Sequence, residues 1–229
     1  MVNTKRREVA IKSLSSWLFV LCITALLCSA CGSTPSANSN ASLRSGDVLF
    51  KDDFSNSNSG WGEWTKEGAL VTYDPSGGLR ILVTETQYDF WSVSGRQFSD
   101  VQMEVDAMLI GGPTDNDFGL ICRYLDESNF YMLLVSSDGY YGIAKMKDGQ
   151  YSMIGSDQLQ YSTAIAQGQS TNRLRGDCVG QNLVLYVNDQ KLMETVDGDF
   201  ASGDVGLLAG AYDEPSVDIL FDNFVVKKP

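Results

Sequence analysis

Two carboxylates at alternate positions of a predicted strand are the first groups in this sequence that could perform acid–base chemistry. Glu104 and Asp106 lie in the stretch MEVDAM, where the two-residue period of a strand turns both side chains to one face. Carboxylates about 5 Å apart are what retaining glycoside hydrolysis requires. The same pattern also fits the solvent-facing flank of a strand, so both interpretations stay open at this point.

The chain contains no histidine, which removes the commonest general base and the commonest metal ligand. Catalysis by Ser-His-Asp or Cys-His groups is therefore excluded. After Cys31 the only cysteines are Cys122 and Cys178, which have no metal-binding spacing. An oxidising compartment would allow them to pair, but a disulfide needs Cα atoms within about 7 Å. Because both lie in predicted strands, we expect two separate buried thiols.

Arg123 lies in the middle of the apolar stretch GLICRYL. Its guanidinium keeps its charge, so it needs acceptors from a neighbouring carboxylate or from a ligand. Alternation places Gly119 on the same face, and the expected strand pairing adds Tyr131. It also adds Gly142 and Ala144, whose small size leaves room for a ligand. We therefore expect this face to point away from the main core, although a structural salt bridge at the sheet rim remains the alternative for Arg123.

Aromatic rings are a second signal, because pyranose rings stack their C–H faces on them. The stretch TQYDFWSV offers Tyr88, Phe90 and Trp91. The stretch SDGYYG offers Tyr140 and Tyr141. Most aromatic side chains in a β-sandwich belong to the core, so only some of these are candidates. The expected ligand-binding residues are Arg123, Tyr131, Trp91 and Tyr88.

Calcium is the one cofactor that the sequence suggests. Two stretches, PTDNDFG and YDEPS, supply carboxylates in predicted loops, the oxygen ligands that a hard cation takes. No EF-hand spacing is present. The candidate metal ligands are Asp115, Asp117, Asp213 and Glu214.

The candidate site residues all lie within residues 47–228. The alternation of apolar and polar residues in this segment is that of an all-β domain. Short alternating or apolar runs such as LRILVTET, FYMLLVSS and VDILFDNFVV recur between Gly, Asp, Asn and Ser. No segment shows sustained apolar spacing at i, i+3, i+4 and i+7. The length suits one core, and we predict a two-sheet antiparallel sandwich.

One turn predicts a strand register. Asp138-Gly139, between LLVSS and YYGIAK, has the chemistry of a two-residue hairpin loop. This loop would place Ser137 opposite Tyr140 and Tyr131 opposite Met146.

Four stretches carry a family resemblance: DDFSNSNSGW, DNDFGLICRYLDESNFYMLLVSSDGYYGI, TNRLRGDCVGQNLVLYVNDQ and FASGDVGLLAGAYDEPSVDILFDNFVV. They resemble concanavalin A-like lectin/glucanase domains of the laminin-G type, closest to bacterial 3-keto-disaccharide hydrolase-like domains, over 49–226. The resemblance implies a jelly-roll sandwich whose chain ends pair and whose concave sheet holds sugars in many relatives. Relatives in family 16 of the glycoside hydrolases use Glu-x-Asp-x-Glu, or one residue longer. In this chain, Met108 or Leu109 occupies the position of the second glutamate.

Residues 1–30 have the organisation of a signal peptide. The basic start MVNTKRREVAIKS precedes the short apolar run WLFVLCITALL and small residues before Cys31. This resembles a bacterial lipoprotein signal, in which the chain is cut before a cysteine that becomes lipidated, although Cys28 stands where that pattern prefers leucine. An uncleaved anchor and cleavage without a lipid are the alternatives. Residues 31–46 then comprise the lipidated cysteine and a polar, flexible tether.

The charge of the chain limits its partners. The net charge is −12, and the first 30 residues are basic, so the remainder is more acidic still. Such a surface repels nucleic acid and anionic lipid head groups. We expect a non-catalytic lipoprotein that binds a carbohydrate or other ligand, works outside the cytoplasm and is held at the membrane by its lipid. The alternatives are an enzyme acting on 3-keto or other modified sugars and a structural envelope protein.

The Cys31→Ser variant should release the chain from membranes. Acyl chains contribute about 0.8 kcal/mol per buried CH₂, whereas a cleaved signal core contributes nothing. Detergent-phase partitioning of the variant and of the unchanged chain measures this release. Equal partitioning of the two would contradict lipidation at Cys31.

Overall fold

The computed structural model describes residues 43–229, and these residues form strands and connecting loops without a helix. Among them there is accordingly no helix with the length and apolarity that a membrane span requires. The predicted signal peptide, Cys31 and most of the predicted tether lie outside the described residues. The prediction of a two-sheet antiparallel jelly-roll sandwich is confirmed.

The first sheet has nine strands. They are β1 (Val48–Asp52), β2 (Trp64–Lys66), β3 (Ala69–Tyr73), β4 (Leu79–Val83), β6 (Val101–Gly111), β12 (Thr171–Val179), β13 (Asn182–Val187), β14 (Gln190–Val196) and β16 (Val217–Lys227). Their order is β14-β13-β12-β6-β16-β4-β3-β2, and β1 pairs with β16.

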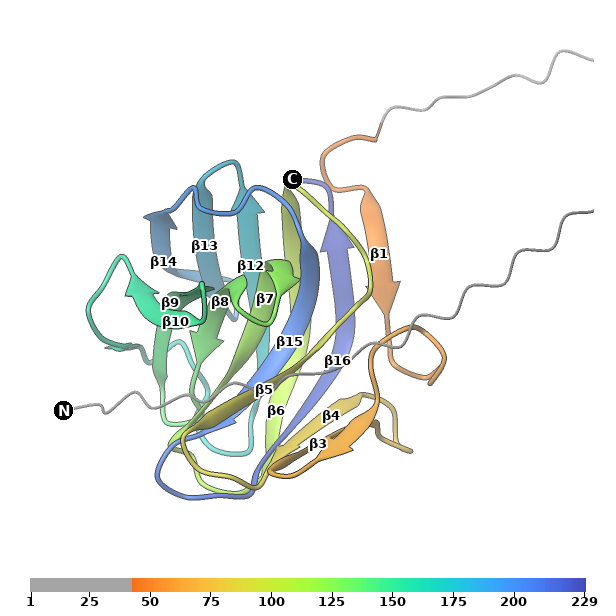
Figure 1. Cartoon of the computed structure of the whole chain (residues 1–229), viewed down its shortest axis with the longest axis vertical. Helices are drawn as coiled ribbons and strands as arrows, with labels where there is room; N and C mark the ends of the chain where they lie inside the picture. Colours follow the sequence, from red (N-terminus) through yellow and green to blue (C-terminus); the bar gives the residue numbers. More distant parts are fainter. Residues whose placement is uncertain (1–42) are drawn as a thin grey trace, which may run out of the picture. The chain divides into compact units, whose positions relative to one another are not determined.

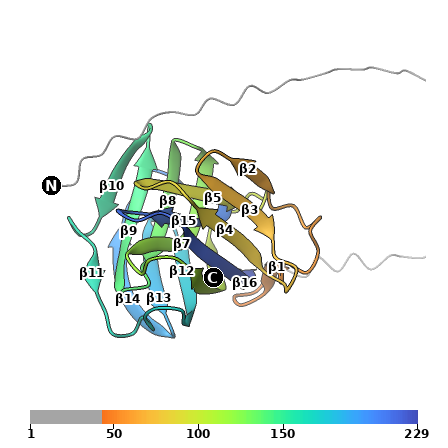
Figure 2. The same ribbon diagram turned by 90° about the horizontal axis from the view of Figure 1, so that it is seen from below.

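The second sheet has seven strands. They are β5 (Tyr88–Val93), β7 (Asn116–Asp126), β8 (Asn129–Val135), β9 (Tyr140–Lys147), β10 (Gln150–Ile154), β11 (Gln160–Tyr161) and β15 (Asp204–Ala211). Their order is β10-β9-β8-β7-β15-β5, and β11 pairs with β9. The layers are visible in Figure 1, and Figure 2 places β10 and β11 on the opposite side of the domain from β1, β2 and β3.

The main core lies between the two sheets and follows the two-residue period of the strands. In β6, the odd-numbered side chains enter the core, while Glu104 and Asp106 point outward. The core-facing residues of this strand are Val101, Met103, Val105, Ala107 and Leu109. Burying one large aliphatic side chain of this kind stabilises the fold by about 1.5–3 kcal/mol.

The two ends of the domain pair with each other, as the family resemblance implies. Phe50 of β1 pairs with Val226 of β16. The amide of Gly46 donates to the carbonyl of Lys228 at 2.8 Å, which extends the pairing beyond the strands. The chain therefore enters and leaves the domain at the same place.

The turn between β8 and β9 is one residue longer than predicted. The amide of Ser136 donates to the carbonyl of Tyr140 at 2.8 Å, which leaves the three-residue loop 137–139. Gly139 has a φ of 103°, a conformation that glycine adopts without the strain of a side chain. The predicted register, with Ser137 opposite Tyr140, is therefore wrong by one residue.

This shift changes the faces of β8. Phe130, and not Tyr131, pairs with Met146 of β9. Leu134 pairs with Gly119 on one side and with Gly142 on the other. A one-residue slip moves every side chain of a strand to the other face. The small residues of β7 and β9 share a face as predicted, but β8 presents its even-numbered residues to that face.

A disulfide joins the two sheets through the core. Cys122 of β7 and Cys178 of β12 have Cα atoms 6.8 Å apart and are fully buried. The expectation of two separate thiols is wrong. Both cysteines face inward from opposite sheets, and a sequence pattern does not reveal which positions of two distant strands meet across the core.

Replacing both cysteines by alanine should destabilise the domain by about 3 kcal/mol, because the disulfide closes a long loop and so restricts the unfolded chain. Urea unfolding followed by tryptophan fluorescence measures the change. The unchanged chain in urea with a reductant should approach the midpoint of the Cys122→Ala/Cys178→Ala variant, while the reductant should leave the variant unaffected. Equal midpoints for all samples would contradict a disulfide.

Candidate functional site

The seven-stranded sheet has a second apolar surface on the side away from the nine-stranded sheet. We call this surface the second face. At its centre lies a cluster of buried side chains: Ile121, Phe130, Met132, Leu134, Ala144, Met146 and Leu208. Half-buried side chains pack around this cluster: Trp91, Tyr124, Tyr151 and Met153.

Three aromatic rings of the second face form one cluster. The ring centroids of Trp91 and Phe130 lie 5.1 Å apart, and those of Tyr124 and Phe130 lie 5.4 Å apart. Trp91 and Tyr124 complete the triangle at 6.5 Å. Aromatic pairs at such distances stabilise one another, which holds the half-buried faces of Trp91 and Tyr124 in fixed orientations.

Two carboxylates lie on the second face above a glycine. Gly210 of β15 pairs with Asp89 of β5 and with Asp117 of β7. A Cβ built on Gly210 would overlap with the Oδ1 atoms of both aspartates, so the carboxylates face each other in the space that glycine leaves. The hydroxyl of Tyr212 donates to Asp117 Oδ2 at 3.2 Å. Burial, followed by the charges of Asp117 and Asp89, raises the pKa of Tyr212, so this hydroxyl remains a donor.

These carboxylates belong to a row of residues that runs across the strands. The strand register continues the row from Asp117 to Ser136, the residue that follows β8. Ser136 is opposite Tyr140 of β9, and Tyr140 pairs with Tyr161 of β11. We call the six residues the cross-strand row: Asp89, Gly210, Asp117, Ser136, Tyr140 and Tyr161. With neighbouring strands about 4.8 Å apart, the row is about 24 Å long.

The structure does not bring the four expected ligand-binding residues together. Trp91 lies on the second face, as described above. Tyr88 is half-buried on the other side of β5, where its ring stacks on Phe90 with centroids 6.2 Å apart. Arg123 and Tyr131 are buried near the crossover from β14 to β15. Their predicted placement away from the main core is therefore wrong.

Tyr131 stabilises this crossover from within the core. Its hydroxyl donates to Asp197 Oδ1 at 2.6 Å and accepts from the amide of Phe200 at 3.1 Å. Burial and the hydrogen bond to Asp197 raise the pKa of Tyr131 to about 12, so the phenol stays protonated. Lys145 forms an ion pair with the other oxygen of Asp197.

Arg123 is a structural residue at the same end of the sandwich. Its φ is 54°, and the register of β7 and β8 is irregular after Cys122, so a bulge turns its side chain. Nη1 donates to the carbonyl of Phe200 at 2.6 Å, and Nη2 lies 3.5 Å from Asp100 Oδ1. Only 2% of Arg123 is exposed. Burial lowers its pKa from the ordinary value, but a guanidinium keeps its charge in proteins.

The small residues that were expected to leave room are mostly used by the fold. A Cβ on Gly119 would overlap with the backbone of Leu133, so this glycine allows β8 to approach closely. A Cβ on Gly142 would meet Met153 and Leu159, which already occupy that space. The space above Gly210 is likewise filled, in this case by the carboxylates of Asp89 and Asp117.

The four candidate calcium ligands separate into two places. Burial and the nearby charges of Asp138, Asp213 and Glu214 raise the pKa of Asp115, so Asp213 and Glu214 act on Asp115. Asp117 belongs to the second face instead. Within residues 43–229 no group of three or more side chains is arranged to hold a metal ion.

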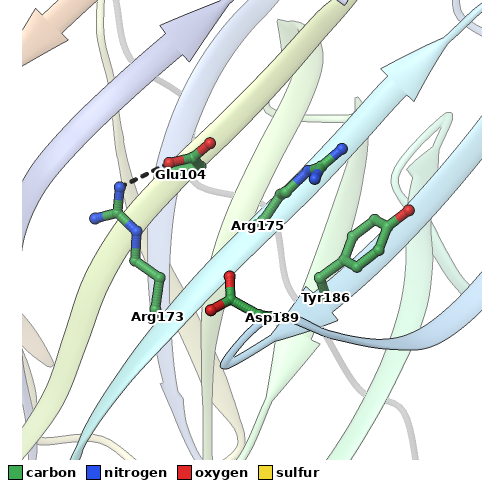
Figure 3. Close-up of a pocket in the computed structure, with 5 residues that line it drawn as sticks. All are labelled: Glu104, Arg173, Arg175, Tyr186 and Asp189. Atoms are coloured by element: carbon green, nitrogen blue, oxygen red, sulfur yellow. Dashed lines mark hydrogen bonds and ion pairs between the residues drawn. The ribbon is translucent and has the colours of Figure 1, made fainter.

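The Glu104–Asp106 pair lies on the outer face of the nine-stranded sheet. A shallow pocket of about 140 Å³ is lined there by five residues: Glu104, Arg173, Arg175, Tyr186 and Asp189. Figure 3 shows Arg173 reaching across to Glu104, a contact of 2.8 Å. Arg173 also contacts Asp106 at 3.1 Å. The guanidinium of Arg175 lies 4.5 Å from the ring centroid of Tyr186 and pairs with Asp177.

This network makes Glu104 unsuitable as a general acid. Burial alone would raise the pKa of Glu104, but hydrogen bonds from Lys227, Arg173 and Gln102 lower it to about 2. A general acid needs a pKa near the working pH, and Glu104 is ionised far below it. The outer face of β6 is a solvent-facing ion-pair network.

Sequence reasoning missed Asp89, Gly210 and Tyr212. The alternation of Asp89 and Trp91 in YDFWSV does place both on one face of a strand. The sequence pattern could not predict that β15 pairs with both β5 and β7, because these strands are distant in the chain.

Solved structures of similar fold place the domain among concanavalin A-like jelly rolls. The carbohydrate-binding module CBM66 from Bacillus subtilis has 18% sequence identity and a TM-score of 0.59, with 74% of this chain and 96% of that chain covered. A glycoside hydrolase family 16 endo-glucanase from Bacteroides ovatus has 12% identity and a TM-score of 0.56, with coverage of 78% and 100%. The β-glucanase of Bacillus licheniformis has 12% identity and a TM-score of 0.54, with coverage of 79% and 97%.

At these identities the likeness shows the fold alone. A scan against family models and a search of curated proteins found no match. The chemistry of the site must therefore be argued from the residues of this chain.

The Arg123→Ala variant should lose about 2 kcal/mol of stability, or roughly 6 °C in Tm, because it removes a buried hydrogen bond to the crossover. Thermal unfolding measures this loss. Lys191→Ala is a suitable control, since it removes an exposed lysine from a surface ion pair with Glu194 and should change Tm far less. An unchanged Tm combined with weaker ligand binding would instead make Arg123 a ligand contact.

Proposed function

We propose that the chain is a non-catalytic carbohydrate-binding lipoprotein that works outside the cytoplasm. In this proposal, Cys31 carries the lipid that attaches the chain to a membrane, and the second face of the seven-stranded sheet binds the glycan. The observation that carries the proposal is the combination of aromatic rings and two facing carboxylates on that face.

The chemistry of the second face suits a sugar. Half-buried Trp91 and Tyr124 offer ring surface for the C–H face of a pyranose. Half-buried Asp89 offers oxygens that accept hydrogen bonds from sugar hydroxyls, and bonds to an ionised acceptor are the stronger ones. Asp117 beside it is buried and adds its charge to the site. A mostly apolar surface with a few convergent polar groups is the usual form of a small-ligand site.

The fold supports the same proposal. The jelly rolls of similar structure include one described as a carbohydrate-binding module and two described as glucanases. Fold alone does not determine function, so this likeness adds weight only beside the residues of the second face.

The proposed location has independent support. The disulfide between Cys122 and Cys178 belongs in an oxidising compartment, since thiols stay reduced in most cytosolic proteins. The apolar run of the N-terminal segment and the small residues before Cys31 resemble a signal for export and lipidation.

A second candidate is an enzyme acting on 3-keto or other modified sugars. The facing carboxylates of Asp89 and Asp117 favour it, because glycoside hydrolysis uses two carboxylates on either side of the scissile bond. Incubation with oligosaccharides and 3-keto disaccharides, followed by mass spectrometry, separates the two candidates. Under the first proposal no product appears; a product that is lost in Asp117→Asn would favour the enzyme.

The Asp89→Asn variant should weaken glycan binding about tenfold, which corresponds to about 1.4 kcal/mol, because it removes a charged acceptor without changing the shape of the side chain. A glycan microarray identifies glycans bound by the full chain in detergent, and titration of a bound glycan measures the affinity. Asp177→Asn is the matched control, since Asp177 lies on the other sheet and pairs with Arg175.

Equal affinities for the Asp89→Asn variant, the control and the unchanged chain would place the glycan elsewhere. Absence of any bound glycan would contradict the proposed function and would favour a structural role in the envelope.

A further inference from the structure

Two tyrosines at the end of the cross-strand row are unusual in their exposure. Six large apolar side chains of the described residues are exposed: Leu43, Val48, Leu125, Tyr140, Tyr161 and Val196. The two aromatic ones, Tyr140 and Tyr161, are 42% and 53% exposed. They contact each other edge to face, with centroids 5.6 Å apart. Exposed aromatic rings that gather in one place commonly mark a binding surface.

Hydrogen bonds hold this pair in place. The amide of Ser162 donates to the carbonyl of Gly139 at 2.9 Å, which ties β11 to the β8–β9 turn. Gln167 Nε2 donates to the hydroxyl of Tyr161 at 2.9 Å. A Cβ on Gly139 would lie only 2.7 Å from the ring of Tyr161, so the ring packs directly against the turn. The tyrosines are thus oriented before any ligand binds, which lowers the entropic cost of binding.

The pair lies on the same side of the sheet as the carboxylates. Alternation along β9 places Tyr140 on the face of Ala144 and Met146, which is the second face. Tyr161 pairs with Tyr140 across β11 and β9. The cross-strand row therefore has half-buried Asp89 at one end and exposed rings at its other end, about 24 Å away by strand spacing. Between them, Gly210, Asp117 and Ser136 are buried.

We propose that Tyr140 and Tyr161 form a distal subsite for an uncharged, linear glycan that spans the second face from Asp89 to these tyrosines. This inference rests on the proposed carbohydrate binding and adds to it a second site, a direction and a ligand class. Ring faces hold the C–H faces of pyranoses, while the tyrosine hydroxyls and the amide of Gln167 supply hydrogen bonds to sugar hydroxyls.

The charges around the row argue for an uncharged ligand. Asp89 and Asp117 lie at one end, and Asp138 lies in the turn next to Tyr140. Asp138, Asp213 and Glu214 lie close enough to Asp115 for their charges to raise its pKa, in addition to burial. An anionic glycan would meet these carboxylates and be repelled.

The test uses the full chain in detergent and affinity electrophoresis in gels that contain linear β-1,4-glucan, β-1,3-glucan, xylan or mannan. Polygalacturonate is the anionic probe. The Tyr140→Ser/Tyr161→Ser variant should bind a retained neutral polysaccharide at least tenfold more weakly. The Tyr140→Phe/Tyr161→Phe variant should keep most of the affinity, because the rings remain. Tyr186→Ser is the matched control on the other sheet. Thermal unfolding confirms that the variants are folded.

Oligosaccharides of increasing length, prepared from the retained polysaccharide, test the direction of the glycan. Affinity should rise with length in the unchanged chain and stop rising earlier in the serine variant, while the shortest oligosaccharide should bind both equally. Full retention of long-chain affinity by the serine variant, with loss in Asp89→Asn, would overturn the distal subsite and leave carbohydrate binding intact. If polygalacturonate retards the unchanged chain but not the serine variant, the proposal that the ligand is uncharged would be overturned. Absence of binding to every probe and to the microarray would overturn both proposals.

Discussion

The register of β8 between β7 and β9 is the constraint on which the rest of the structure depends. Leu134 lies between Gly119 and Gly142, and Gly119 lets the backbone of β8 come close. This register sends Tyr131 into the main core, where its hydroxyl reaches the chain that crosses to the seven-stranded sheet. The same register places the even-numbered side chains of β8 on the second face. One register therefore determines which side chains of β8 enter the core and which enter the candidate site.

The outer faces of the two sheets have opposite chemistry. The nine-stranded sheet carries charges that are paired with one another, such as Arg173 with Glu104, and so its polar groups are largely satisfied within the protein. The second face of the seven-stranded sheet carries aromatic rings, methionines and a small number of carboxylates. This contrast, and not the presence of carboxylates alone, distinguishes a surface suited to a ligand from one suited to water.

The sequence predicted the class of fold because alternation and turn residues are local signals. It predicted less of the site, since the site depends on how strands distant in the chain are paired. Asp138-Gly139 correctly marked a turn, but whether the loop has two or three residues depends on the hydrogen bond from Ser136 to Tyr140. That single residue moved Tyr131 from the expected surface to the core. The disulfide and the Asp89–Asp117 pair were missed for the same reason, because each joins positions that only the assembled sheets bring together.

The burial of the disulfide sets the order of events in folding. Cys122 and Cys178 are fully buried, so an oxidant reaches the two sulfurs only while the sheets are still apart. Oxidation must therefore precede or accompany closure of the sandwich, and a chain that closes first would trap its thiols in the reduced form. Once closed, the domain shields the bond from external thiols, since exchange requires access to a sulfur. The finished protein is then indifferent to the redox conditions that its assembly requires.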